Sequence, residues 1–173
     1  MDKYLIICGS PRMGNMYRLS KMLVERLSVR DAKIVLLANT DIKYCTGCLK
    51  CEDEGLCPIN DMMGNIRNDM VSAETIIFAT PVYFDNLPGK LKTLIDRSNL
   101  FMSDLAGKKC FAFLCGQADA QSWENCAKII ENYAGICKMD YLGYVAVQAR
   151  DIEDLNDTQI NDMFSTIFKL LGE

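Results

Sequence analysis

The sequence predicts an α/β fold in which a five-stranded parallel sheet is doubly wound, with helices on both faces. Short, continuously apolar runs alternate along the chain with longer segments whose apolar residues recur at helical spacing. Continuous apolar strands are typical of parallel sheets that are covered on both sides. Right-handed crossovers between five such strands favour the order 2-1-3-4-5.

The first half of the chain contains the first two predicted strands and the first two helices. Residues 3–8 form a short apolar strand that runs directly into a loop, and residues 15–27 have apolar residues at helical spacing. Residues 33–38 predict the second strand, and residues 59–71 predict the second helix. The segment 41–58 between them is the only long irregular stretch, and loops of this length in a compact domain usually have a function.

The second half continues the same alternation. Strands and helices are expected there, in turn, at residues 74–79, 88–100, 110–115, 122–137, 141–147 and 157–171. Pro88 suits the first turn of a helix. Because the chain has no internal repeat and no linker, residues 1–173 are expected to form a single domain with a cysteine-rich insert at 41–58.

Composition excludes several classes of protein. The net charge of −4 provides no broad basic surface, so nucleic acid is not an expected partner. No apolar run approaches the roughly 18 residues of a membrane helix, and the N-terminus lacks a signal peptide, so we expect a cytoplasmic protein. The nine cysteines are then expected as thiols or metal ligands. The absence of histidine removes the usual neutral-pH general base, which indicates that a cofactor carries the chemistry.

The loop after the first strand has the residues of a phosphate site. Gly9 allows a sharp turn, Ser10 offers a hydroxyl group, and Arg12 adds a fork of donors. Asn15 begins a helix, whose N-terminus favours an anion. The dinucleotide pattern G-x-G-x-x-G is absent, so an ordinary turn with a helix cap is the alternative.

A second loop, residues 80–86, follows the third strand. In the order 2-1-3-4-5 the first and third strands flank the crevice in which ligands bind, so the two loops should meet. Tyr83 and Phe84 supply flat aromatic surface beside Pro81. A phosphate-bearing planar ligand such as FMN fits this combination, and Gly116 in a third loop would complete the pocket.

Four cysteines occur at C-x2-C-x2-C-x5-C spacing, namely Cys45, Cys48, Cys51 and Cys57. Thiolates at such short, glycine-containing spacing can wrap a [4Fe–4S] cluster, and Pro58 repeats the closing Cys-Pro of bacterial cluster motifs. A zinc ribbon separates its two C-x2-C pairs by a dozen or more residues, so zinc or another metal fits less well. Free or redox-active thiols remain an equal alternative.

Together these motifs resemble the NAD(P)H-dependent FMN reductases, which are flavodoxin-like, and within them the iron–sulfur flavoproteins. The resemblance is carried by Gly-Ser-Pro-Arg in the first loop, the four-cysteine motif, Thr-Pro-Val-Tyr-Phe in the second loop, and Lys-Leu-Lys-Thr-Leu-Ile-Asp-Arg at residues 90–97. It covers residues 3–115 in order. It also implies a homodimer or a tetramer.

The resemblance assigns roles to individual residues. The FMN phosphate would be held by Ser10, Arg12, Asn15 and Met16. The flavin ring would be held by Pro81, Val82, Tyr83, Phe84 and Asn86. The sequence departs from the family at Met16, where a hydroxyl is common, and at Asp85, where a small residue is usual.

The implied function is an FMN-dependent oxidoreductase that takes hydride from NAD(P)H and passes electrons to a small molecule or a ferredoxin-like protein. The alternatives are a non-enzymatic electron carrier and a thiol-redox regulator using Cys45 and Cys48. Lys90, Lys92 and Arg97 are expected on a solvated helix face. The remaining cysteines are expected in the core, and residues 121–173 carry no recognisable chemistry.

Overall fold

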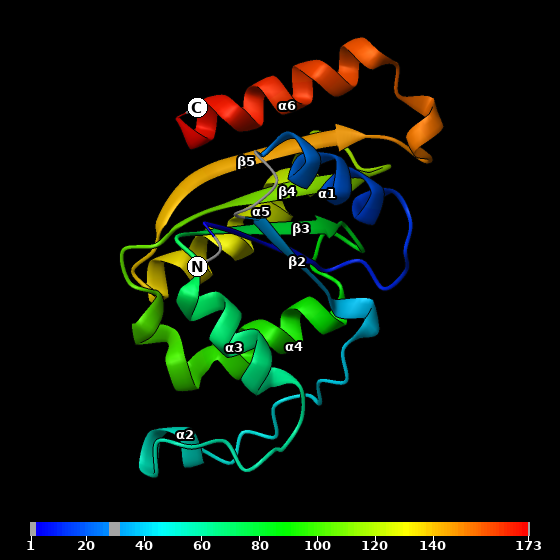
Figure 1. Ribbon diagram of the computed structural model, residues 1–173. Helices are drawn as coiled ribbons and strands as arrows, with labels where there is room; N and C mark the ends of the chain where they lie inside the picture. The colour runs from blue at the N-terminus through cyan, green and yellow to red at the C-terminus, as the bar shows by residue number, and fades with distance from the viewer. Residues whose placement is uncertain (1–2, 28–31, 173) are drawn as a thin grey trace.

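The computed structural model describes residues 3–27 and 32–172. Within these residues one sheet contains the strands β1 (Tyr4–Cys8), β2 (Ala32–Leu36), β3 (Thr75–Pro81), β4 (Lys109–Gly116) and β5 (Asp140–Gln148). The strands lie in the order β2-β1-β3-β4-β5 and all pair in parallel (Figure 1). The predicted fold class and the predicted strand order are therefore confirmed.

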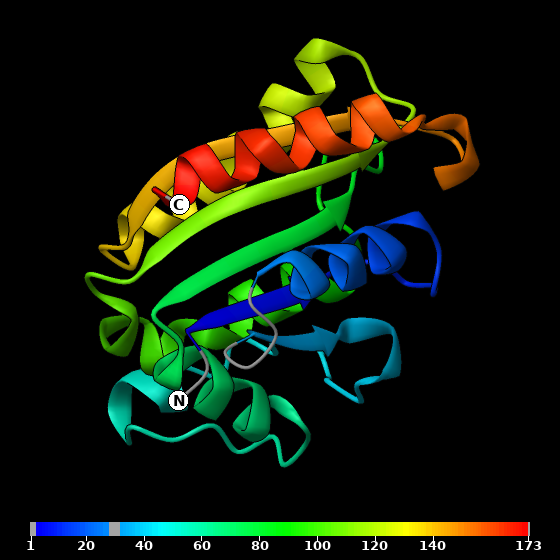
Figure 2. The same ribbon diagram turned by 45° about the horizontal axis from the view of Figure 1, so that its top comes forward.

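Helices cover both faces of the sheet. The α-helices are α1 (Asn15–Arg26), α2 (Lys50–Asp53), α3 (Met63–Ser72), α4 (Gly89–Arg97), α5 (Ala120–Ile136) and α6 (Asp157–Leu171). The 3-10 helices are η1 (Leu37–Asn39), η2 (Ser98–Leu105) and η3 (Ile152–Asp154). Figures 1 and 2 show α1 and α6 on one face, with α3, α4 and α5 on the other. In the described ranges, no helix is both long enough and apolar enough to cross a bilayer.

The sheet separates two hydrophobic clusters. Leu5 and Ile7 of β1 pack into the cluster under α3, α4 and α5, whereas Ile6 and Cys8 of the same strand pack into the cluster under α1 and α6. Successive side chains of a strand point to opposite faces, so a strand covered on both sides must be apolar at every position. This requirement explains the continuous apolar run that predicts β1.

Local capping chemistry fixes the ends of α6. The Asn156 side chain accepts a hydrogen bond from the backbone N–H of Gln159, and the Gln159 side chain accepts one from the backbone N–H of Asn156. Such a reciprocal pair marks a helix start. Gly172 ends the helix with φ of 77°, a conformation that glycine adopts easily. The observed bounds of α6 equal the predicted range 157–171.

The predicted helix 88–100 is shorter in the structure. α4 ends at Arg97, and the chain continues as η2, in which Phe101 has non-helical dihedral angles. The Ser98 hydroxyl donates to the Ile95 carbonyl at 2.7 Å and accepts from the Tyr133 hydroxyl at 2.8 Å. A serine that bonds the backbone in this way competes with regular helical hydrogen bonds.

The five cysteines outside the insert are buried, as predicted: Cys8, Cys110, Cys115, Cys126 and Cys137. Burial raises the pKa of Cys110 and Cys126 to about 12 and that of Cys115 to about 11. These thiols therefore stay protonated at neutral pH and act as small core residues.

Candidate functional site

A pocket lies at the carboxyl ends of the strands, where the loops after β1, β3, β4 and β5 meet. It is lined by Ser10, Arg12, Asn15, Met16, Pro81, Val82, Tyr83, Cys115, Gly116, Gln117, Ala149 and Arg150. Eight of the ten residues predicted to bind FMN belong to this lining, and Phe84 and Asn86 do not. The topology therefore brings the three predicted loops together at one edge of the sheet.

The first loop depends on a glycine. The Gly9 N–H donates to the Ala79 carbonyl at 2.8 Å, which holds the loop against β3. A Cβ atom at Gly9 would lie 2.9 Å from Leu91 Cδ2 and 3.2 Å from Thr80 Oγ1, so no larger residue fits without displacement. The Ser10 hydroxyl then donates to the Arg12 carbonyl at 2.7 Å and shapes the turn.

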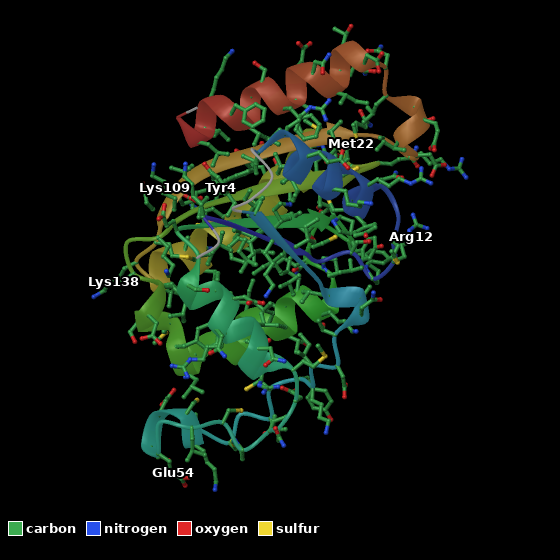
Figure 3. The ribbon with its side chains drawn as sticks, in the orientation of Figure 1. Tyr4, Arg12, Met22, Glu54, Lys109 and Lys138 are labelled. Atoms are coloured by element: carbon green, nitrogen blue, oxygen red, sulfur yellow. The ribbon has the colours of Figure 1, made fainter. Side chains whose placement is uncertain are left out.

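The start of α1 has no side-chain cap. Gly14 is the N-cap and provides no side-chain hydrogen bond to the first turn. A Cβ at Gly14 would lie 3.2 Å from Arg12 Nε, so the Arg12 side chain lies over this helix end. The Asn15 side chain donates to the Arg150 carbonyl at 2.7 Å and ties the helix start to the loop after β5. Figure 3 shows Arg12 at the edge of the molecule toward which the strands point.

The second loop makes a tight turn at Tyr83–Asn86. Tyr83 and Asn86 exchange backbone hydrogen bonds of 3.0 and 3.1 Å, and the central residues Phe84 and Asp85 have φ of 50° and 58°. This geometry turns Phe84 outward, where its side chain is fully exposed. The Asn86 side chain instead accepts from the Leu87 N–H at 2.8 Å. Both residues therefore differ from the sequence expectation that they line the ligand pocket.

Asp85 has a structural partner that the sequence does not reveal. Its carboxylate accepts a hydrogen bond of 2.5 Å from the Ser122 hydroxyl at the beginning of α5. This contact fixes the turn between Tyr83 and Asn86 to a helix that follows a different strand. The unusual acidic residue thus holds the second loop in place.

Residues after β5 belong to the pocket although the sequence pattern assigned them no chemistry. Ala149 and Arg150 line it, and the Ala149 N–H donates to the Gly116 carbonyl at 3.1 Å. Cys115, predicted only as a core residue, and Gln117 line it as well. Ligands in such folds bind outside the carboxyl ends of the strands, so the position of Arg150 just after the predicted fifth strand is a signal that could have identified it.

The four clustered cysteines lie on a surface loop, residues 44–58, which we call the cysteine loop. Figure 1 shows it with α2 below α3 and α4, on the side away from the sheet. Its thiols, Cys45, Cys48, Cys51 and Cys57, all line a second pocket. In the part of the chain that the structure describes, no three His, Cys, Asp or Glu side chains are grouped to hold a single metal ion.

Two N–H groups point at cysteine sulfur atoms of this loop. Asn99 Nδ2 donates to Cys51 Sγ at 3.3 Å, and the Gly47 N–H donates to Cys45 Sγ at 3.5 Å. Gly47 has φ of 65°, a left-handed conformation that glycine adopts without strain, so the loop can turn sharply here. Donors of this kind are typical partners of metal-bound sulfur.

The prediction of a solvated face for Lys90, Lys92 and Arg97 is correct only for Lys92, which is exposed and pairs with Asp96. Lys90 is half-buried and donates to the carbonyls of residues 37, 38 and 40. The Arg97 side chain is 2% exposed and forms an ion pair of 2.8 Å with Asp61. The charges of Lys90 and Arg97 therefore hold backbone and carboxylate groups inside the molecule.

Comparison with known proteins agrees with this architecture. Residues 3–150 match the family model described as NADPH-dependent FMN reductase. An iron–sulfur flavoprotein of Methanosarcina thermophila is 38% identical over 97 residues, 54% of this chain and 51% of that protein. One from Clostridioides difficile is 32% identical over 117 residues, 62% of this chain and 51% of that protein. The chain thus spans about half the length of these curated relatives.

Solved structures share the fold at low sequence identity. An NADH:FMN oxidoreductase in its apo form superposes with a TM-score of 0.73 at 18% identity, covering 98% of this chain and 88% of that chain. The Trp repressor binding protein of Bacillus subtilis superposes with a TM-score of 0.70 at 19% identity, covering 98% and 97%. With most of its length matched by the family model, the chain belongs to the NADPH-dependent FMN reductase family.

Proposed function

We propose that this protein is an FMN-dependent oxidoreductase that accepts hydride from NADH or NADPH and passes the electrons to a small molecule or a redox protein. One observation carries the proposal: a single pocket combines a helix N-terminus and Arg12 with the apolar and aromatic surface of Pro81, Val82 and Tyr83. An anion site beside a flat apolar surface suits a phosphate joined to a planar ring.

The residues present fit FMN. Ser10, Arg12 and the uncapped first turn of α1 would hold the phosphate, because both charge and free N–H groups favour an anion there. Tyr83 and Val82 would contact the ring. Gly116 leaves room beside it, because a Cβ at that position would meet only Trp123 Cη2, at 3.8 Å. When bound, the flavin would supply hydride acceptance and electron release, and the protein supplies position and polarity.

A titration with FMN tests the pocket. Quenching of FMN fluorescence is expected for the wild-type protein, with affinity at least about tenfold weaker in Arg12→Ala because a charged hydrogen-bond partner of the phosphate is lost. Arg18→Ala is the matched control, since Arg18 lies one turn into the same helix but is paired with Glu153 at 2.6 Å. Equal affinity of both variants and the wild type would reject the phosphate site.

We further propose that the cysteine loop binds a [4Fe–4S] cluster through Cys45, Cys48, Cys51 and Cys57. Four thiols lining one pocket form the donor set of such clusters. In such a cluster each cysteine binds a different iron, so the four thiols need only surround the cluster. A zinc site would instead require the four thiols to converge on one ion. The curated relatives named iron–sulfur flavoproteins support this choice. When bound, the cluster would transfer single electrons.

Anaerobic purification with a visible spectrum and iron and sulfide assays tests the cluster. About four irons and four sulfides per chain are expected, falling to background in the double variant Cys45→Ser and Cys48→Ser. Thr46→Ala is the control, because it alters the same exposed loop without removing a thiol. Clean flavin bands without iron would leave an FMN reductase with free thiols.

Reaction with reduced nicotinamide separates an enzyme from an electron carrier. Rapid bleaching of the flavin bands by NADH or NADPH under anaerobic conditions is expected for the reductase, and its absence would favour a carrier resembling flavodoxin.

Nine cysteines, with all described thiols free, suit a reducing compartment, so we propose a cytoplasmic location. A homodimer or a tetramer remains our proposal for the assembly.

A further inference from the structure

The two ends of the cysteine loop meet at one buried ion pair. Arg97 Nη1 donates to the Lys43 carbonyl at 2.7 Å, immediately before the loop, and to Asp61 Oδ2 at 2.8 Å. Arg97 Nη2 donates to the Ile59 carbonyl at 3.4 Å, immediately after the loop, and to Asp61 Oδ1 at 3.2 Å. Asp61 Oδ2 also accepts the Lys43 N–H at 2.8 Å. A single guanidinium therefore closes the neck of the loop.

Burying this ion pair costs free energy, because both charged groups lose their contact with water. The Arg97 and Asp61 side chains are 2% and 1% exposed. The attraction between the two charges offsets this cost only when their hydrogen bonds are well made. Replacing such a pair by apolar residues of similar size often leaves a protein equally stable. A planar fork that binds a carboxylate and two carbonyls at once is something that only arginine provides. The arrangement therefore points to a positional role.

One donor of Arg97 is left over. Within the described residues, its Nε is the only buried side-chain nitrogen or oxygen without a hydrogen-bond partner. Arg97 and Cys57 both line the four-cysteine pocket. A buried orphan donor is rare and calls for a partner.

A second donor lies next to it on the same pocket. Asn99, two residues further along the chain, donates from Nδ2 to Cys51 Sγ at 3.3 Å. The end of α4 and the start of η2 therefore present two side-chain N–H donors beside two of the four thiols. N–H groups that reach sulfur are one of the levers by which proteins set the potential of iron–sulfur clusters.

We propose that Arg97 is a positioning residue of the four-cysteine site. It closes the neck of the cysteine loop through Asp61 and the flanking carbonyls, and it keeps its Nε–H available for a sulfur atom of the group that the cysteines bind. This inference rests on the proposed iron–sulfur site and adds to it the residue that holds the loop in register with α4.

Arg97→Lys and Arg97→Gln, with Lys92→Gln as control, test the proposal. Lys92 lies on the same helix but is exposed and paired with Asp96. In the protein without iron, protease cleavage within the cysteine loop is expected to rise about tenfold or more in both Arg97 variants, because neither side chain can bind both loop ends. Far-ultraviolet circular dichroism, which depends on neither site, should match the wild type and report that the fold is intact.

The loaded protein provides the second readout. After reconstitution, the reduction potential of the cluster should fall in Arg97→Gln, which removes a positive charge and an N–H donor, and fall less in Arg97→Lys, which keeps the charge. Lys92→Gln should match the wild type in both assays. If Arg97→Gln does not fold, Arg97→Lys carries the test alone through loop cleavage and potential.

The outcomes separate the two proposals. If the wild-type protein binds no iron, the iron–sulfur site is wrong and so is the role of Arg97 Nε. If the wild type binds iron, and the Arg97 variants show the wild-type potential and resist cleavage like Lys92→Gln, then the role of Arg97 is wrong and the iron–sulfur site stands.

Discussion

The substitution Gly9→Ala tests how the first loop of the pocket is held. The added Cβ would lie 2.9 Å from Leu91 Cδ2, 3.1 Å from Leu91 Cβ and 3.2 Å from Thr80 Oγ1. Leu91 and Thr80 are both fully buried, and the Leu91 Cβ can move only if α4 moves. Overpacking of this kind costs about 1–3 kcal/mol of unfolding free energy. For a chain of this size each kcal/mol lowers the melting temperature by about 2–4 °C.

Urea unfolding and an FMN titration measure the two consequences. We expect a lower midpoint at unchanged slope, and FMN affinity weakened about tenfold or more, because the displaced chain carries Ser10 and Arg12 away from the start of α1. Gly64→Ala is the control: a Cβ there meets nothing within 4 Å, and it replaces a glycine inside α3. Because Gly64 is the second residue of α3, that variant should be at least as stable as the wild type. A Gly9→Ala protein as stable as the wild type would refute the steric argument.

Three further predictions concern groups whose environment the structure defines. Burial alone would raise the pKa of Asp61, but hydrogen bonds from Arg97 and backbone N–H groups lower it to about 2, so its stabilisation is present above about pH 4 and is lost as the pH falls toward 2. Asp61→Asn should therefore cost about 3–5 kcal/mol at neutral pH in urea unfolding, and the difference from the wild type should shrink below about pH 4; a constant difference contradicts the ion pair. In the protein without iron, iodoacetamide followed by mass spectrometry should label the exposed Cys45 and spare Cys115, whose pKa burial raises to about 11; equal labelling of the two in the folded protein would argue against that burial. Ser122→Ala removes the hydroxyl that holds Asp85 and should weaken FMN binding several-fold with little loss of stability, and unchanged affinity would mean that the turn holds itself.

Some elements could be predicted because their signals are local. The capping pair of Asn156 and Gln159 and the terminal Gly172 all lie within or beside the sequence of α6, and the apolar run of β1 reports its burial directly. The strand order follows from a general rule of right-handed crossovers rather than from any contact between particular residues. Such features depend on neighbouring residues or on topology alone, so a single sequence contains them.

The environment of Arg97 shows what a sequence contains only in part. The buried side of α4 holds Leu91, Leu94 and Arg97, which are spaced three residues apart. This helical spacing is visible in the sequence and indicates that Arg97 shares a face with the two leucines. From the sequence, Arg97 is nevertheless grouped with the cations Lys90 and Lys92, and all three are expected on a solvated helix face. The partner of Arg97, Asp61, lies 36 positions away in the chain, and only the folded structure brings the two together.

The candidate site shows the same division. Ser10, Arg12 and Tyr83 follow predicted strands, and the topology places them at one edge of the sheet, where the structure has them. The outward turn of Phe84 depends on two successive residues with positive φ, a conformation that Asp85 tolerates but that a bulky residue such as Phe84 rarely adopts. A conformation that opposes local preference is held by longer contacts such as the one between Asp85 and Ser122, which the sequence does not display.

Helix α4 links the two candidate sites. Leu91 packs against the turn at Gly9 beside the proposed FMN pocket, whereas Arg97, nearly two turns later, holds both ends of the cysteine loop. The two residues are six positions apart and so span about 9 Å of helix at 1.5 Å per residue. Lys90 adds bonds to the carbonyls of residues 37 and 40, just before that loop. Because a helix transmits displacement along its axis, the overpacking caused by Gly9→Ala should also raise protease cleavage in the cysteine loop, whereas Gly64→Ala should not.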